Sequence, residues 1–151
     1  MKYWLMKSEP TDYSIDDLEQ DGHIDWYGIR NYQARNFMRD QMCIDDLAFF
    51  YHSNCKEPGI VGVMKVYKLA YPDKLQFESG HKYHDPKSDP KNPRWVNVDM
   101  AFVKKTRLLS LNEIRTYPEL ETLKILQRGN RLSITPLTKF EWDFINKKLT
   151  T

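Results

Sequence analysis

The chain has 151 residues, which is the usual size of one domain and enough to bury a substantial core. Hydrophobic residues make up 40% and charged residues 29%, as in a soluble globular protein, while the aromatic fraction of 13% is high. A net charge of only +2 excludes a protein that coats a long nucleic-acid backbone, so a nucleic acid would be bound through few phosphates and mainly in a pocket. We expect a single domain over residues 1–151.

The sequence also bears on the compartment. It contains no apolar run of the length that crosses a bilayer and no signal-peptide pattern. Two cysteines, Cys43 and Cys55, do not make a disulfide framework. We expect reduced thiols, no membrane contact and a cytoplasmic location, or a nuclear one in a eukaryotic cell.

The first half of the chain predicts short strands and short helices. Residues 3–6 are typical of a strand, and Ser14 followed by two aspartates indicates the cap and first turn of a helix. An asparagine can cap a second helix over residues 31–42. Two β-rich segments follow at 47–51 and 60–69.

The second half begins with a long segment, 72–93, that is rich in proline, lysine and aspartate; loops of this length are usually functional or disordered. Residues 95–105 alternate apolar and polar side chains, as a strand does. Capping-box sequences at 110–113 and 138–141 open two helices. The remaining expected elements are a short helix at 118–127 and a short strand at 131–134.

The order of these elements predicts the fold class. The strands are short, they do not alternate regularly with helices, and no internal repeat is present, which argues against a doubly wound parallel sheet. We predict an α+β fold, a small and mostly antiparallel β-barrel with helices inserted between its strands.

The sequence WYGIRNYQARN at residues 26–36 is the most informative segment. Its polar groups would all need buried partners in a core, so it is poor core material. Aromatic rings stack on flat ligands, carboxamides hydrogen-bond to base edges and arginine holds phosphate, so it suits recognition. An amphipathic helix with inward rings and solvated arginines is the alternative, and this segment alone leaves both open.

Five stretches in chain order resemble the EVE domain family. They are YWLMKSEP at 3–10, WYGIRNYQARN at 26–36, FYHSNC at 50–55 before GIVG at 59–62, DPKS at 85–88 before NPRW at 92–95, and RLSITP at 131–136 before EW at 141–142. That family has the pseudouridine-synthase-and-archaeosine-transglycosylase-like (PUA-like) barrel, which is shared with YTH, ASCH and SRA domains, several of which bind modified bases. The resemblance implies a PUA-like barrel that recognises a modified base in DNA or RNA, without a cofactor or metal.

The resemblance also gives candidate base-binding residues. Extruding a base costs a few kcal/mol and one aromatic stack returns about 1–3 kcal/mol, so polar contacts must supply selectivity. Trp26 is the best stacking candidate, because a tryptophan in the corresponding turn of YTH domains forms a wall of the base cage; Tyr32 is weaker. Ser8 and Asn31 are candidates for the base edge, and His52 for a hydrogen-bond donor. Core packing, a turn and a helix cap are the structural alternatives for Trp26, Ser8 and Asn31.

Four basic residues are candidate phosphate ligands: Lys7, Arg30, Arg35 and Arg94. The start of the helix expected at residue 31 would add a favourable site for an anion. A solvated or internally paired basic surface is the alternative for all four.

The expected function is therefore a nucleic-acid-binding module that takes a modified base into an aromatic pocket. His52 and Cys55 have no evident third group to complete a nucleophile, which favours binding over catalysis. Two alternatives stay open. One is an enzyme or a binder of nucleotide-like small molecules that uses the same pocket, and the other is an interaction protein whose aromatic face binds another chain.

Overall fold

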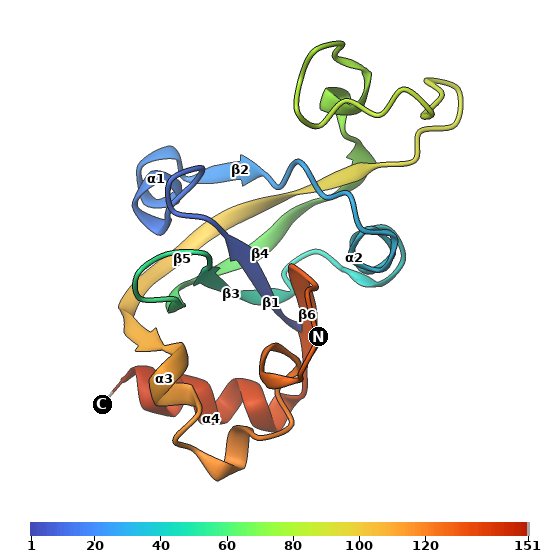
Figure 1. Ribbon diagram of the computed structural model, residues 1–151. Coiled ribbons are helices and arrows are strands. Elements are labelled where there is room, and N and C mark those ends of the chain that lie inside the picture. The colour runs from blue at the N-terminus through green and yellow to red at the C-terminus, as the bar shows by residue number, and fades with distance from the viewer. Residues whose placement is uncertain (151) are drawn as a thin grey trace.

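The computed structural model describes residues 1–150 as one six-stranded sheet with helices on both of its faces (Figure 1). The strands are β1 (Tyr3–Ser8), β2 (His23–Asp25), β3 (Leu47–His52), β4 (Gly59–Pro72), β5 (Val96–Ser110) and β6 (Ile134–Leu137). The α-helices are α1 (Ile15–Asp21), α2 (Tyr32–Asn36), α3 (Leu111–Ile114) and α4 (Lys139–Leu149). A π-helical turn at Phe37–Gln41 continues α2, and 3-10 turns lie at Lys74–Phe77, Pro118–Leu120 and Lys124–Leu126. No helix within this range has the length and apolarity needed to cross a bilayer.

The strands lie in the order β2-β5-β4-β3-β1-β6. Only β1 and β3 pair in parallel, and the other four neighbours are antiparallel, so the predicted α+β fold with a mostly antiparallel sheet is confirmed. Within residues 1–150 the edge strands β2 and β6 do not pair with each other. The sheet is therefore open, and the closed barrel of the prediction is not confirmed.

Side chains of the central strands alternate between two cores. In β1, Trp4 and Met6 enter one core, and Leu5 enters the other. Phe50 and Phe49 divide in the same way in the neighbouring strand β3. The first core packs under α1 and α2, and the second under α3 and α4, on the other side of the sheet (Figure 1). Both faces of β1 and β3 are thus covered, which gives the loops at the ends of these strands a rigid base.

Helix starts follow the local capping chemistry that the sequence predicts. Ser14 and Thr138 form reciprocal capping boxes at the starts of α1 and α4. The Ser110 hydroxyl accepts a hydrogen bond from the third backbone N–H of α3, and the Asn31 side chain accepts one from Ala34 at the start of α2. These caps depend on neighbouring residues only, which is why the sequence locates them.

Elements that depend on distant partners differ from the prediction. Strand β2 was not predicted, since three residues carry no periodic signal and only its pairing with β5 makes it a strand. The helix expected at 118–127 is two separate 3-10 turns. The strand expected at 131–134 lies at Ile134–Leu137, where its residues pair with β1. The second half of the helix expected at 31–42 is π-helical.

The long segment between β4 and β5 is ordered by one buried glutamine. The amide nitrogen of Gln76 donates to the carbonyls of Asp73 (2.6 Å) and Trp95 (2.8 Å). Its amide oxygen accepts from the Trp95 backbone N–H (3.1 Å) and the Ser88 hydroxyl (2.6 Å). Four hydrogen bonds therefore tie the two ends and the middle of the segment together, and Tyr83 is carried on it.

Candidate functional site

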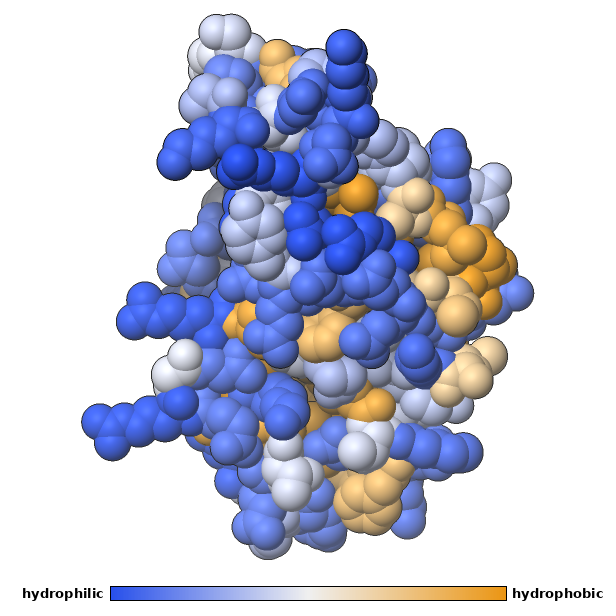
Figure 2. All heavy atoms as spheres, turned by 90° about the vertical axis from the view of Figure 1, so that its right-hand side faces the viewer, coloured by the Kyte–Doolittle hydropathy of each residue, from blue (hydrophilic) through white to orange (hydrophobic). Residues whose placement is uncertain are grey.

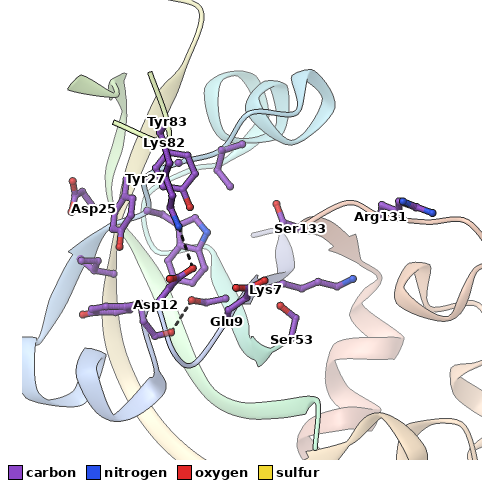
Figure 3. Close-up of a pocket in the computed structure, with 16 residues that line it drawn as sticks. Lys7, Glu9, Asp12, Asp25, Tyr27, Ser53, Lys82, Tyr83, Arg131 and Ser133 are labelled. Carbon is purple, nitrogen blue, oxygen red and sulfur yellow. Dashed lines mark hydrogen bonds and ion pairs between the residues drawn. The ribbon is translucent and has the colours of Figure 1, made fainter. Parts of the chain in front are cut away.

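A cavity of about 500 Å³ opens where the end of β1 faces the turn after β2 and the loop that carries Tyr83 (Figure 3). Its walls combine aromatic rings with both acidic and basic side chains. The lining residues are Lys7, Ser8, Glu9, Asp12, Tyr13, Ile24, Asp25, Trp26, Tyr27, Gly28, Ile29, Ser53, Lys82, Tyr83, Arg131 and Ser133.

Three rings, those of Trp26, Tyr27 and Tyr83, line one end of the cavity. Trp26 is 6% exposed and packs edge-on against Phe50, with ring centroids 5.5 Å apart and an interplanar angle of 83°. Its indole N–H makes no hydrogen bond within residues 1–150 and is not one of the fully enclosed unpaired donors there. The core thus fixes the ring, while its indole N–H has no hydrogen-bond partner among the described residues.

The turn after Trp26 is shaped by its neighbour across the cavity wall. Gly28 has a φ of +79°, and a Cβ on it would lie 2.6 Å from the Tyr83 ring, so a side chain here would strain the backbone and displace that ring. The Gly28 N–H donates to the buried Asp73 carboxylate at 2.9 Å. Arg30 donates to the same carboxylate at 3.2 Å and twice to the Tyr83 carbonyl, at 3.0 and 2.8 Å. Asp73 and Arg30 therefore join the turn at Gly28 to the loop that carries Tyr83, and these two segments form one wall of the cavity.

Tyr27 supplies a second polar group at this end. Its ring meets the Tyr83 ring edge-on at 6.1 Å, and its hydroxyl has no partner within residues 1–150. Burial raises the pKa of Tyr27 above its ordinary value, so the hydroxyl stays protonated and can donate. In Figure 3 the ring lies beside Tyr83, across the cavity from Lys7.

The opposite end of the cavity is polar and basic. Lys7 lies there with Ser53, Ser133 and Arg131, and Glu9 lies beside Lys7, as Figure 3 shows. The Lys7 ammonium lies 5.9 Å from the centroid of the Tyr51 ring, and burial lowers the pKa of Lys7. The cavity thus offers a planar aromatic surface at one end and positive charge at the other.

Of the predicted base-binding residues, Trp26 and Ser8 line the cavity. The Ser8 hydroxyl donates to the Tyr13 carbonyl at 2.7 Å, which is the structural role in a turn that was its alternative. The hydroxyl oxygen can still accept a hydrogen bond. A contact from either residue to a base stays a prediction.

The other three candidates, Asn31, Tyr32 and His52, are not among the lining residues. Asn31 caps α2, and Tyr32 is 51% exposed and stacks on Trp95 at 4.8 Å. The His52 Nε2 accepts from the Ile15 N–H at 3.1 Å, and burial lowers the pKa of His52. Asn31 therefore fills the cap role that was its structural alternative, and contact with a ligand stays a prediction for all three residues.

Among the predicted phosphate ligands, only Lys7 lines the cavity. Arg30 belongs to the wall described above. Arg35 donates to the Arg94 carbonyl at 2.9 Å and lies over the Tyr32 ring at 4.7 Å, while Arg94 lies 3.8 Å from the Asp85 carboxylate. These arginines have internal partners, and a phosphate contact from them stays a prediction.

Five residues that line the cavity were not predicted from the sequence. Tyr83 and Lys82 come from the segment that offered no periodic pattern, and Arg131, Ser53 and Ser133 come from loops. A glycine inside an aromatic motif, such as Gly28, indicates that another group approaches closely. It does not identify that group as Tyr83, which lies 55 residues away in the sequence.

The face that carries α2 is mainly polar, with one group of apolar side chains at its upper right-hand edge and smaller groups elsewhere (Figure 2). A broad apolar surface is the usual mark of a stable protein interface, and this face does not show one. This view therefore adds no support to the alternative of an interaction protein.

Comparison with known proteins agrees with the fold and covers nearly the whole chain. The family profile described as "EVE domain" matches residues 2–148. Rat thymocyte nuclear protein 1 is 47% identical, over 95% of this chain and 71% of that protein. The crystal structure of human THYN1 protein in complex with 5-methylcytosine-containing DNA is 43% identical, with a TM-score of 0.94 over 100% of this chain and 99% of that one. A crystal structure from Pseudomonas syringae is 44% identical, with a TM-score of 0.93 over 97% and 98% of the two chains.

Proposed function

The chain belongs to the EVE domain family, and from that membership we propose that it binds nucleic acid and takes a modified base into the cavity beside Trp26. The human THYN1 structure contains 5-methylcytosine DNA, so DNA is the favoured polymer and 5-methylcytosine the first base to test. The rat, mouse and human relatives are named thymocyte nuclear protein 1, and this name lends no support to the cytoplasmic location expected from cysteine usage.

The observation that carries this proposal is the cavity itself. Its volume of about 500 Å³ falls in the range of small-ligand sites, roughly 300–1,000 Å³, and three rings line one end. A base extruded from the duplex would stack against Trp26, with Tyr27 and Tyr83 as side walls. Extrusion costs a few kcal/mol and one stack returns about 1–3 kcal/mol. Burying a methyl group on the base would add about 0.8 kcal/mol, which gives a modified base its advantage.

Polar groups that line the cavity would orient the base. The Trp26 indole N–H and the Tyr27 hydroxyl have no protein partner within residues 1–150, and Ser8 offers an acceptor oxygen. We place these three groups against the edge of the base. A base that cannot satisfy them would leave buried polar groups unpaired, which is the costly outcome that produces selectivity.

Titration of the protein with duplexes that differ only in one cytosine modification, at a fixed salt concentration, tests the proposal. Wild-type protein should bind the 5-methylcytosine duplex more tightly than the unmodified one. Trp26→Phe keeps much of the core packing but presents a smaller ring, so affinity and preference should both fall several-fold. Trp142→Phe makes the same substitution in the second core and should leave binding unchanged. Equal binding by wild-type protein and Trp26→Phe would remove Trp26 from the site.

A further inference from the structure

We propose that the end of the cavity opposite the rings is a phosphate site, formed by Lys7, Arg131, Ser53 and Ser133, for a backbone phosphate of the nucleotide whose base lies at Trp26. This inference rests on the proposed function and deepens it, because it assigns the second half of the cavity to the second half of a nucleotide. Three of the four residues, all except Lys7, have no role in the sequence-based prediction.

Lys7 is a cation without a counter-ion. It stands at the end of β1, half-buried, and forms no ion pair within residues 1–150; its ammonium lies 5.9 Å from the centroid of the Tyr51 ring. A charge that is partly removed from water without a partner is unfavourable, and burial accordingly lowers the pKa of Lys7. An anion in the cavity would supply the missing partner.

Arg131 and two serine hydroxyls complete the set of donors. Arg131 is exposed on the loop before β6 and has no ion pair or hydrogen bond within the described residues. Backbone hydrogen bonds hold both serines beside β1, from the Lys7 N–H to the Ser133 carbonyl at 2.8 Å and from the Ser53 N–H to the Ser8 carbonyl at 3.0 Å. Their hydroxyls have no partner in the same range. A guanidinium, an ammonium and hydroxyls are all groups from which phosphate oxygens accept hydrogen bonds.

Acidic side chains limit where an anion can lie in the cavity. Glu9 accepts from the Asn54 amide at 2.9 Å, and Asp12 lies 3.7 Å from the Lys82 ammonium. Figure 3 shows Asp12 and Lys82 on the aromatic side and Ser53, Ser133 and Arg131 on the other, with Glu9 beside Lys7 between them. Like charges repel, so the Asp12 side favours a neutral base and the Lys7 side favours the phosphate. A nucleotide has the same arrangement, because its sugar joins a neutral planar base to an anionic phosphate.

The test combines protein variants with one altered phosphate in the DNA. Lys7→Ala and Arg131→Ala are titrated against 5-methylcytosine and unmodified duplexes over a series of salt concentrations. Each variant should bind both duplexes roughly tenfold more weakly, with an unchanged preference for the modified base. Loss of one phosphate contact should also reduce the slope of log K against log salt by about 1. Arg128→Ala, in the same loop, and Lys104→Ala, on β5, are exposed controls that should bind within twofold of wild type.

A neutral methylphosphonate next to the modified base, placed 5′ in one duplex and 3′ in another, identifies the contact. On one of these duplexes wild-type protein should lose as much affinity as the variants, and the variants should lose nothing further. Lys7→Met, which keeps an unbranched side chain over Tyr51, replaces Lys7→Ala where the latter does not fold. Variants that bind as wild type, or that lose equal affinity on both neutral duplexes, overturn the phosphate site while the Trp26 result stands on its own. A wild-type protein that binds none of the duplexes overturns the proposed function and this site with it.

Discussion

Gly28 lets the loop at Tyr83 close against the turn that follows Trp26. Its φ of +79° is in the left-handed region, and the Tyr83 ring occupies the space of a Cβ. We expect Gly28→Ala to lose about 1–2 kcal/mol of unfolding free energy to the backbone, and a further roughly 1–3 kcal/mol as Tyr83 is displaced. Gly80→Ala is the matched control, because Gly80 has a φ of +82° with no atom within 4 Å of a Cβ. Denaturant titration of both variants should show the larger loss at Gly28; equal losses would mean that Tyr83 moves away without cost.

Asp73 joins the turn, the loop and Arg30 through one buried carboxylate. Its side chain is 1% exposed and accepts from the Gly28 N–H, the Leu75 N–H and Arg30. Asp73→Ala leaves the two backbone N–H groups without an acceptor and the Arg30 guanidinium without its counter-ion, and we expect a loss of about 3–5 kcal/mol in unfolding free energy. Asp143→Ala breaks only an exposed pair with Lys139 and should cost less than about 0.5 kcal/mol. Similar losses in the two variants would show that Asp73 is not what holds the turn.

At the residue scale, three of the candidate binding residues, Trp26, Ser8 and Lys7, line the cavity. The family resemblance indicated Trp26, and positions at the end of a strand indicated the other two; contact with a ligand stays a prediction for all three. The partners of Gly28 could not be predicted. Tyr83 and Asp73 reach the turn only because β4 and β5 bring the intervening loop back to β2, and a single sequence contains no local signal for that contact.

The segment between β4 and β5 shows how an element without periodicity can still be ordered. Gln76 is fully buried and makes four hydrogen bonds. Gln76→Leu fills similar space but leaves backbone groups unpaired, so we expect a loss of at least about 2 kcal/mol. Amide hydrogen exchange over residues 78–95 should become faster, whereas exposed Gln33→Leu should leave exchange there unchanged. Unchanged exchange in Gln76→Leu would show that other contacts order the segment.

At the element scale, the sequence predicted what local chemistry determines. The caps at Ser14, Ser110 and Thr138 lie where expected, because each needs only a residue three positions along the chain. Strand β2 and the turns between Pro118 and Leu126 were missed or mistyped. Their backbone conformations depend on strand pairing and on the second core, so their own residues carry a weak signal.

At the scale of the whole molecule, His52 links the sheet to the first layer of helices. It lies at the end of β3 and accepts the Ile15 N–H at the start of α1, which requires a neutral Nε2. Burial lowers the pKa of His52, with Asp16 opposing and Lys105 adding to this shift. The unfolded chain therefore binds the proton more readily, and stability is full above the ordinary histidine pKa of about 6.5 and falls as pH drops below it. His52→Gln should remove part of the stability loss between about pH 7 and pH 5 in denaturant titrations; an unchanged pH dependence would contradict this.

The overall α+β architecture and its mostly antiparallel sheet were predictable, because strand spacing and the family resemblance both indicate them. Whether the sheet closes into a barrel was not predictable, because closure depends on pairing between the edge strands β2 and β6. Within residues 1–150 these two strands do not pair. The low net charge of +2 agrees with a molecule that would hold one nucleotide in a cavity and touch few phosphates.

Base extrusion into the cavity can be measured with 2-aminopurine placed next to 5-methylcytosine in a short duplex, since its fluorescence rises when stacking is lost. Saturating wild-type protein should produce a clear rise with the modified duplex and a smaller one with the cytosine duplex, and Trp26→Phe should reduce it. If fluorescence stays at the level of free duplex while binding is saturated, the base remains stacked in the DNA and the cavity beside Trp26 does not receive it.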